Sequence, residues 1–254
     1  MRKREYLNIL IVVNNVKLTL CFSSLEFLWL SLHPMSTFSI IITAGGIGKR
    51  MGAKLPKQFM LIKERPLLMY TIEQFYNFDT KAQIILTLPS EWKEYWEKLI
   101  NENDFKIPHR IIEGGTERYH SVKKALELCA GDYVMVHDGV RPLVDSQTIK
   151  TCAIAVKSKK AVVPVIPVNE SMRKITGESS KAVNRSDYRT VQTPQCFERE
   201  LLVKAYEQKF HKGITDDAGL VEESGVKIHT VQGNFENIKI TTKTDLLFAE
   251  QLLK

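Results

Sequence analysis

The chain has 254 residues, of which 44% are hydrophobic and 26% charged, and its formal net charge is +7. This is ordinary globular composition, and one α/β domain of this length can bury a sizeable core. The charge suits a small anionic substrate, and no tract dense in lysine and arginine marks a nucleic-acid partner. The four cysteines are scattered and form no C-x-x-C pair, so neither thiolate metal sites nor a disulfide framework is expected. We expect buried cysteines in a cytoplasmic protein.

Residues 1–37 differ in character from the rest of the chain. Their apolar residues are interrupted by polar ones such as Asn14, Lys17 and Glu26, whereas a membrane span needs about 20 predominantly apolar residues. The apolar core and cleavage site of a signal peptide are not clear either. We expect an N-terminal extension that is disordered or lies upstream of a translation start at Met35, with no membrane partner. The alternative is a targeting segment.

A glycine-rich segment follows the first strand expected in the domain. The apolar run 38–42 predicts a buried strand, and it leads directly into residues 43–51 (TAGGIGKRM). Glycines let backbone N–H groups approach an anion, while Lys49, Arg50 and Lys57 supply positive charge. The pattern predicts a phosphate-binding site in a nucleotide-handling enzyme. The alternative is a solvated basic loop.

Two common phosphate-binding motifs do not fit this segment. A P-loop requires serine or threonine after Gly-Lys, but Arg50 follows Lys49. The dinucleotide fingerprint requires a third glycine three residues after the second, and that position is Met51. Both a P-loop NTPase and a Rossmann dehydrogenase are therefore disfavoured.

Strands and helices are expected to alternate over the rest of the domain. The pattern predicts three helices: one that begins at Pro66, one that carries Trp92 and Trp96 as packing residues, and one over 117–129. It predicts strands at 83–88, 109–112, 133–136 and 161–165. This alternation is typical of a Rossmann-like, doubly wound α/β fold with a mainly parallel sheet. In such sheets, ligands bind at the carboxyl ends of the strands.

Residues 167–192 break this alternation. Two polar strand-like runs flank a turn-rich segment at 176–180, and they contain too few apolar residues to bury themselves. We expect a protruding β-hairpin arm that leans on another subunit. The alternative is a floppy surface loop.

Two further motifs follow predicted strands. Gly114-Gly115 opens a helix whose free N–H groups, together with Ser121, could read the edge of a base, although plain helix capping would look the same. Asp138 suits magnesium or a sugar hydroxyl, and Arg141 suits phosphate. The alternative for these two is a local ion pair.

Two other residues are weaker candidates. His137 is expected to be structural, because no serine or cysteine nucleophile motif accompanies it. Lys239 lies in a short β-like run, where a lone lysine usually faces solvent.

Together these segments resemble the 2-C-methyl-D-erythritol 4-phosphate cytidylyltransferase family of the isoprenoid precursor pathway. The resemblance covers roughly residues 38–253, and it implies a cytidylyltransferase domain over 38–254. Its markers are 44–51 (AGGIGKRM), 56–58 (PKQ), Gly114-Gly115 with Arg118 and Ser121-Val122, His137-Asp138 with Arg141-Pro142, 193–195 (TPQ), Thr215-Asp216 and 237–239 (NIK). Motifs in this order are specific for sugar- and polyol-phosphate cytidylyltransferases, and less so for the individual substrate.

The resemblance implies a reaction and a set of site residues. A phosphate oxygen of the substrate attacks the α-phosphorus of CTP and pyrophosphate leaves, so fixed cations that stabilise the growing charge are the main catalysts. The resemblance gives Arg50 and Lys57 this role. It assigns CTP binding to Ala44, Gly45, Gly46, Gly48, Gly115 and Ser121. It assigns the polyol phosphate to Asp138, Arg141, Ser171 and Thr215, with Arg185 and Lys239 positioning the attacking phosphate.

The resemblance also implies a cofactor and a partner. Mg²⁺ is held mainly by the triphosphate rather than by dedicated protein ligands, with Asp138 as a candidate ligand. The arm reaches across a homodimer, so that Ser171 and Arg185 serve the neighbouring subunit's site.

Three other functions are weighed against this one. A ribitol-5-phosphate cytidylyltransferase would share fold and chemistry, and Asn184-Arg185 in place of an Asp-Arg pair bears on the acceptor, but the segment 215–218 (TDDA) favours methylerythritol phosphate. An inactive nucleotide-binding protein would not need all the candidate cations. An NAD(P) oxidoreductase is disfavoured by Met51.

Overall fold

The structure is a computed structural model that describes residues 6–13, 16–23, 37–46 and 55–253. The chain divides into two compact units, Met1–Ser36 and Thr37–Lys254. Among the residues described, no helix has the length and apolar character needed to cross a membrane.

The first unit contains a hairpin that the sequence pattern did not predict. Strands β1 (Tyr6–Val13) and β2 (Val16–Ser23) pair antiparallel. They flank two asparagines, a residue type favoured in tight turns. That residues 1–37 are disordered or lie upstream of the true start stays a prediction.

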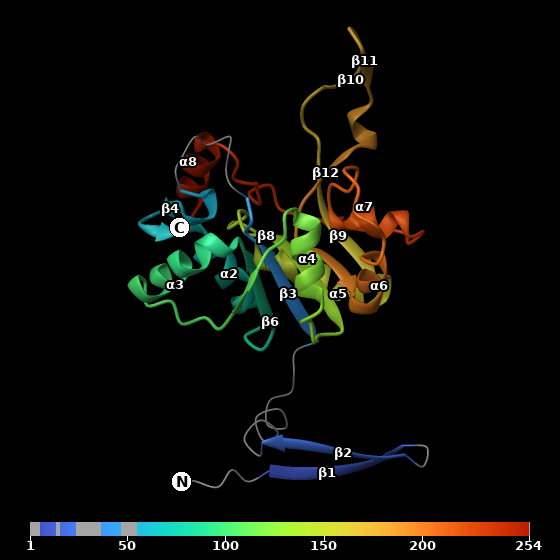
Figure 1. The fold of residues 1–254 in the computed structure, drawn as a ribbon. Helices are drawn as coiled ribbons and strands as arrows, with labels where there is room; N and C mark the ends of the chain where they lie inside the picture. The colour runs from blue at the N-terminus through green and yellow to red at the C-terminus, as the bar shows by residue number, and fades with distance from the viewer. Residues whose placement is uncertain (1–5, 14–15, 24–36, 47–54, 254) are drawn as a thin grey trace. The chain divides into compact units, whose positions relative to one another are not determined.

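The second unit is built on an eight-stranded sheet (Figure 1). Seven of its strands lie in the order β12-β9-β13-β8-β3-β6-β7, and β14 pairs with β9. The strands are β3 (Phe38–Thr43), β6 (Gln83–Leu88), β7 (Arg110–Glu113), β8 (Tyr133–Asp138), β9 (Ala161–Pro167), β12 (Arg189–Val191), β13 (Gln195–Glu198) and β14 (His229–Gln232). The central β3 is parallel to β6 and β8, and β6 is parallel to β7, whereas β12 and β13 run antiparallel to their neighbours. The predicted mainly parallel sheet is confirmed.

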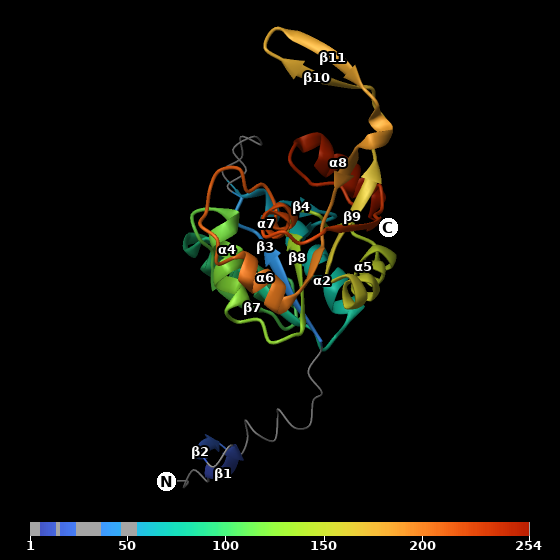
Figure 2. The same ribbon diagram turned by 90° about the vertical axis from the view of Figure 1, so that its right-hand side faces the viewer.

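Helices cover both faces of this sheet. They are α2 (Leu67–Phe78), α3 (Lys93–Glu102), α4 (Arg118–Leu126), α5 (Ser146–Lys159), α6 (Arg199–Ala205), α7 (Asp217–Glu223) and α8 (Lys243–Leu252). Figure 2 shows α2 and α5 on one side of the sheet and α4 and α6 on the other. The doubly wound α/β class predicted from the sequence is confirmed.

The central strand explains why the core has two halves. Successive side chains of a strand point to opposite faces, so Ile40 and Ile42 of β3 pack on the face that α2 and α5 cover, and Ile41 packs on the face that α4 and α6 cover. All three are fully buried. Burying such a side chain stabilises the fold by roughly 1.5–3 kcal/mol, which makes β3 a rigid support for the segments that leave its end.

The structure agrees with most local predictions. Pro66 is the N-cap of α2, and Trp96 is fully buried and stacks on Phe59 with ring centroids 6.0 Å apart. Buried thiols are confirmed for the three cysteines whose side chains are described, Cys129, Cys152 and Cys196.

One local prediction is wrong. Lys239 does not lie in a strand, because the backbone over residues 237–241 is irregular. The N–H of its neighbour Ile240 donates to the carbonyl of Val140 at 3.0 Å. That bond joins the irregular segment to the turn after β8 without extending the sheet.

The predicted arm is present as a protruding hairpin. Strands β10 (Met172–Thr176) and β11 (Ser179–Val183) pair antiparallel, and most of their side chains are exposed. The hairpin projects away from the body of the second unit (Figures 1 and 2).

Candidate active site

The carboxyl ends of three parallel strands meet at one edge of the sheet. Thr43 of β3 pairs with Asp138 of β8 and with Thr87 of β6. Just beyond these ends, the Gly139 N–H donates to the Thr43 carbonyl at 2.8 Å, and the Ala44 N–H donates to the Thr87 carbonyl at 3.0 Å. The candidate loops after β3 and β8 therefore start side by side.

The glycine-rich loop is anchored where it begins. Ala44 is buried, and its carbonyl accepts a bond of 2.6 Å from Nε2 of Gln58, in the short helix η2 (Lys57–Phe59). The Lys57 side chain runs beside the loop, since its Cε lies 3.5 Å from where a Cβ on Gly46 would be. The structure thus brings Lys57 to the loop. Gly48 and Arg50 lie outside the described residues.

A second backbone cradle forms at the start of α4. The Gly115 N–H donates to Ser121 Oγ at 2.9 Å, and that hydroxyl donates to the Glu117 carbonyl at 3.2 Å. A Cβ on Gly115 would lie only 2.2 Å from the Cβ of His120, so a glycine is required for this close approach. Gly115 and Ser121 are brought together as predicted, beside a helix N-terminus that favours negative charge.

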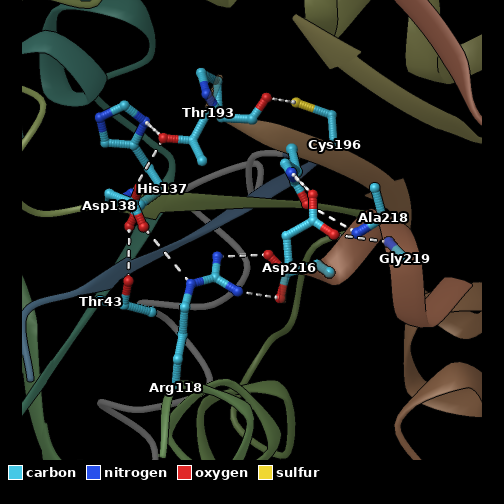
Figure 3. Close-up of polar contacts among 12 residues, drawn as sticks. Thr43, Arg118, His137, Asp138, Thr193, Cys196, Asp216, Ala218 and Gly219 are labelled. Carbon is cyan, nitrogen blue, oxygen red and sulfur yellow. Dashed lines mark hydrogen bonds and ion pairs between the residues drawn. The ribbon is translucent and has the colours of Figure 1, made fainter. Parts of the chain in front are cut away.

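Asp138 is the electrostatic centre of the edge. Its Oδ2 lies 3.1 Å from Arg141 Nε and 3.0 Å from Lys239 Nζ, and its Oδ1 lies 3.6 Å from Arg118 Nε. Figure 3 shows Arg118 extended toward this carboxylate. Burial raises the pKa of Asp138, but the three cations outweigh it and hold the pKa well below the usual range. The ion pair with Arg141 is therefore real, and Lys239 joins it.

Arg118 and Asp217 form a buried pair that sequence reasoning missed. Arg118 donates to both carboxylate oxygens of Asp217, at 2.9 and 2.6 Å, and the Tyr206 hydroxyl donates to the same group at 2.6 Å. Burial lowers the pKa of Arg118, but the negative charges of Asp217 and Asp138 raise it by more, so the guanidinium stays charged. The sequence marked Arg118 only as a family marker, and Asp217 only as part of the segment 215–218 that favours methylerythritol phosphate.

The N-terminus of α7 is capped beside this pair. Asp216 accepts from the Gly219 N–H at 2.9 Å (Figure 3). It also accepts from Gln195 Nε2 at 2.7 Å. Thr215, the preceding residue, is exposed. The cap, together with the Arg118–Asp217 pair, ties the segment that carries Thr215 to the edge of the sheet.

The structure does not bring the arm residues to this edge within one chain. Ser171 and Arg185 are exposed, and Arg185 donates to the backbone carbonyl of Asn169, within the arm itself.

The donor set limits how a metal could be held. Over the described part of the chain, no group of three or more His, Cys, Asp or Glu side chains could hold an ion. Asp138 is ionised and offers oxygen, the donor that Mg²⁺ prefers, but cations already face it. These residues fit a metal bound mainly by substrate phosphates with at most one carboxylate.

Comparison with known proteins decides the family. Residues 38–254 match the family described as IspD, 2-C-methyl-D-erythritol 4-phosphate cytidylyltransferase. The chain belongs to this family. It is 50% identical over 214 residues to the 2-C-methyl-D-erythritol 4-phosphate cytidylyltransferase of Bacteroides fragilis, covering 84% of this chain and 98% of that protein. The corresponding Porphyromonas gingivalis protein is 44% identical over 216 residues, with 84% and 96% covered.

Solved structures agree with this membership. The crystal structure of the cytidylyltransferase of the same name from Thermus thermophilus is 32% identical, with a TM-score of 0.70 and coverage of 84% of this chain and 97% of that one. The structure of 4-diphosphocytidyl-2C-methyl-D-erythritol synthase from Anaerococcus prevotii has a TM-score of 0.75 at 27% identity, with 86% and 96% covered.

Membership of the IspD family confirms the predicted enzyme class. The chain is a CTP-dependent cytidylyltransferase of the isoprenoid precursor pathway, and its acceptor is 2-C-methyl-D-erythritol 4-phosphate. The ribitol phosphate alternative is not favoured.

Proposed function

We propose that the cytidylyl transfer takes place at the carboxyl edge of the sheet, between the two backbone cradles and the charge cluster around Asp138. The observation that carries this proposal is the convergence of Arg141 and Lys239 on Asp138 beside the loop that follows β3. Three cations face the buried carboxylate of Asp138, and Asp217 neutralises one of them, Arg118, so the cluster keeps a net positive charge. The surplus of positive charge favours a phosphorylated substrate.

The nucleotide occupies the two cradles. The backbone of Ala44, Gly45, Gly46 and Gly48 holds the triphosphate of CTP, and Gly115 and Ser121 hold the cytosine. Arg50 and Lys57 stabilise the negative charge that grows on the α-phosphate and on pyrophosphate as the bond breaks. Fixed cations suit this work because phosphoryl transfer depends mainly on positioning and electrostatic stabilisation. The path of Lys57 alongside Gly46 supports its role.

The acceptor occupies the Asp138 side. Asp138 accepts from hydroxyls of the polyol, Thr215 and Arg141 line the same pocket, and Lys239 holds the attacking phosphate. The Lys239 side chain is 44% exposed while that of Asp138 is 8% exposed. The ammonium can therefore turn toward a phosphate while the carboxylate stays fixed.

Asp138 is the residue we propose would help to hold Mg²⁺ on the triphosphate. A bound Mg²⁺ would neutralise part of the phosphate charge. The low pKa of Asp138 keeps its carboxylate ionised and able to bind a cation.

The arm is proposed to act on a second copy of the chain. Most side chains of its strands are exposed, and its Ser171 and Arg185 make no contact with the edge of their own chain that the structure shows. In a homodimer, residues 167–192 would reach the partner's site, where Arg185 would join the partner's cations at the attacking phosphate.

Pyrophosphate release tests the proposal. Purified chain, CTP and Mg²⁺ are incubated with methylerythritol phosphate or with ribitol phosphate, and release is expected with the first alone. Asp138→Asn should raise the KM for methylerythritol phosphate. Release by wild type together with an unchanged KM in Asp138→Asn would keep the reaction and reject the proposed acceptor site.

A further inference from the structure

His137, the residue before Asp138, uses both ring nitrogens in hydrogen bonds to segments beside the proposed binding site of the methylerythritol phosphate. It is fully buried in β8, with Nε2 3.1 Å from the Arg141 carbonyl and Nδ1 2.9 Å from Thr193 Oγ1. A carbonyl oxygen can only accept, so Nε2 carries the proton and donates. Nδ1 is then the acceptor, and the Thr193 hydroxyl donates to it (Figure 3).

These bonds belong to a closed circuit around the candidate acceptor residues. Thr193 Oγ1 also accepts from the backbone N–H of Asp138 at 3.2 Å. Asn237 Nδ2 donates to the Thr193 carbonyl at 2.8 Å, and Arg141 Nη1 donates to the Asn237 carbonyl at 2.8 Å. The circuit therefore returns to Arg141, whose own carbonyl His137 holds. Each member fixes either the backbone or the side chain of a residue that faces the acceptor.

The imidazole is held neutral and in one plane. Burial outweighs the other influences and lowers the pKa of His137 to about 4. Phe75 packs edge-to-face on the ring with centroids 4.7 Å apart. A ring fixed in this way has one tautomer and one orientation, which is what a rigid link between two segments needs.

We propose that His137 is a positioning residue for the acceptor phosphate and polyol, and that it acts by fixing the turn 138–141 through Arg141 and the 192–194 segment through Thr193. The inference rests on the proposed assignment of Asp138 and Arg141 to the acceptor. Groups that must be held within a fraction of an ångström depend on such supporting hydrogen bonds. An apolar residue would fill the same space but would leave the Arg141 carbonyl and the Thr193 hydroxyl without their partner.

Three variants of His137 test its bond to the Arg141 carbonyl and its bond to the Thr193 hydroxyl separately. His137→Gln can keep a donor toward the Arg141 carbonyl, and His137→Asn can keep an acceptor for the Thr193 hydroxyl. His137→Phe keeps the ring shape and neither bond. We expect His137→Phe to raise the KM for methylerythritol phosphate roughly tenfold, with the KM for CTP changed less than about twofold. His137→Gln and His137→Asn should each recover part of this loss.

His109 provides the matched control. It is also a histidine with both ring nitrogens bonded, to Trp96 Nε1 at 3.0 Å and to the Ile107 carbonyl at 2.8 Å, but its partners lie on α3 and the segment before β7. His109→Phe should lower stability and leave both KM values unchanged. Thr193→Val removes the hydroxyl at constant shape, and it should reproduce the selective rise in KM even if His137→Phe does not fold.

The outcomes separate positioning from general stability. If His137→Phe and Thr193→Val lower the melting temperature but leave the KM for methylerythritol phosphate unchanged, His137 is only structural. Equal rises in both KM values, or the same change in His109→Phe, would also overturn the proposal. If Asp138→Asn raises this KM and the His137 variants do not, the acceptor site is retained and the positioning role of His137 is rejected. If Asp138→Asn has no effect, the acceptor site itself is misassigned.

Discussion

Lys239 Nζ lies 3.0 Å from Asp138 Oδ2, which joins the segment before α8 to the carboxyl end of β8. The backbone next to this lysine is anchored, since the Ile240 N–H bonds to the Val140 carbonyl and the Ile240 side chain is fully buried. The ammonium itself stays partly exposed. A partly exposed cation on a fixed backbone is suited to binding a phosphate that arrives and leaves.

Removing this cation should weaken the reaction with the acceptor. Lys239→Met keeps the stem and removes the charge, and it should lower kcat/KM for methylerythritol phosphate about 10²-fold, the usual effect of losing one charged transition-state contact. Steady-state pyrophosphate release measures it. Lys243→Met, at an exposed lysine at the start of α8, is the control and should be near wild type. Equal activity of the two variants would contradict the assignment of Lys239.

Arg50 and Lys57 should control the rate of the chemical step. Arg50→Ala and Lys57→Ala should each lower kcat by about 10²-fold or more, because each removes a cation from the developing charge on the α-phosphate and pyrophosphate. Single-turnover measurements with saturating CTP isolate this step. Lys81→Ala, at an exposed position before β6, serves as the control. If kcat is unchanged in both variants, the catalytic role assigned to these residues is wrong.

Stability should decrease as the pH is lowered because two histidines have lowered pKa values. The pKa of His137 is lowered from 6.5 to about 4 in the folded chain. Below pH 6.5 this histidine is therefore protonated in the unfolded chain, whereas in the folded chain it stays neutral down to about pH 4. The free energy of unfolding is therefore highest above pH 6.5 and falls as the pH drops toward 4, by about 1.4 kcal/mol per unit for one such group. Burial also lowers the pKa of His109, which adds in the same direction.

Urea unfolding between pH 6.5 and 5 measures this slope, in a range where most carboxylates stay ionised. His137→Phe should flatten the slope by the share of one histidine, whatever its effect on stability at pH 7. An unchanged slope in this variant would mean that His137 is not held neutral in the folded chain.

Mixing defective chains should restore activity if the arm serves a partner. In a mixed dimer of Arg185→Ala and Lys57→Ala chains, one site combines an intact body with an intact arm. Equal mixing with free exchange should then give roughly a quarter of wild-type activity, since half of the dimers are mixed and each has one intact site of two. A mixture of Lys57→Ala and Lys239→Met chains has no intact site and should stay inactive. Absence of recovery in the first mixture would place Arg185 in its own chain's site.

The sequence alone determined the class of fold and the family. Apolar runs that alternate with helical patterns, a glycine-rich segment directly after Thr43, and a polar hairpin are local features, and local chain chemistry sets them. The same information placed Gly115 near Ser121, since both belong to one helix start. The contact between Asp138 and Arg141 could also be predicted from the sequence, because a short turn connects the two residues.

Only the tertiary structure decided which distant groups meet. The local pattern alone made Lys239 look like a solvent-facing residue, and only the family resemblance marked it as a candidate. The pairs Arg118–Asp217 and His137–Thr193 gave no signal in the sequence, because their members lie on different elements. The first pair depends on the packing of α4 against the start of α7, and the second depends on the register of β13 with β8. A side-chain pattern records which face of an element is buried, but not which charged group from another element will face it. Packing of the whole sheet and its helices makes that choice, and here it gathers three cations around one buried carboxylate.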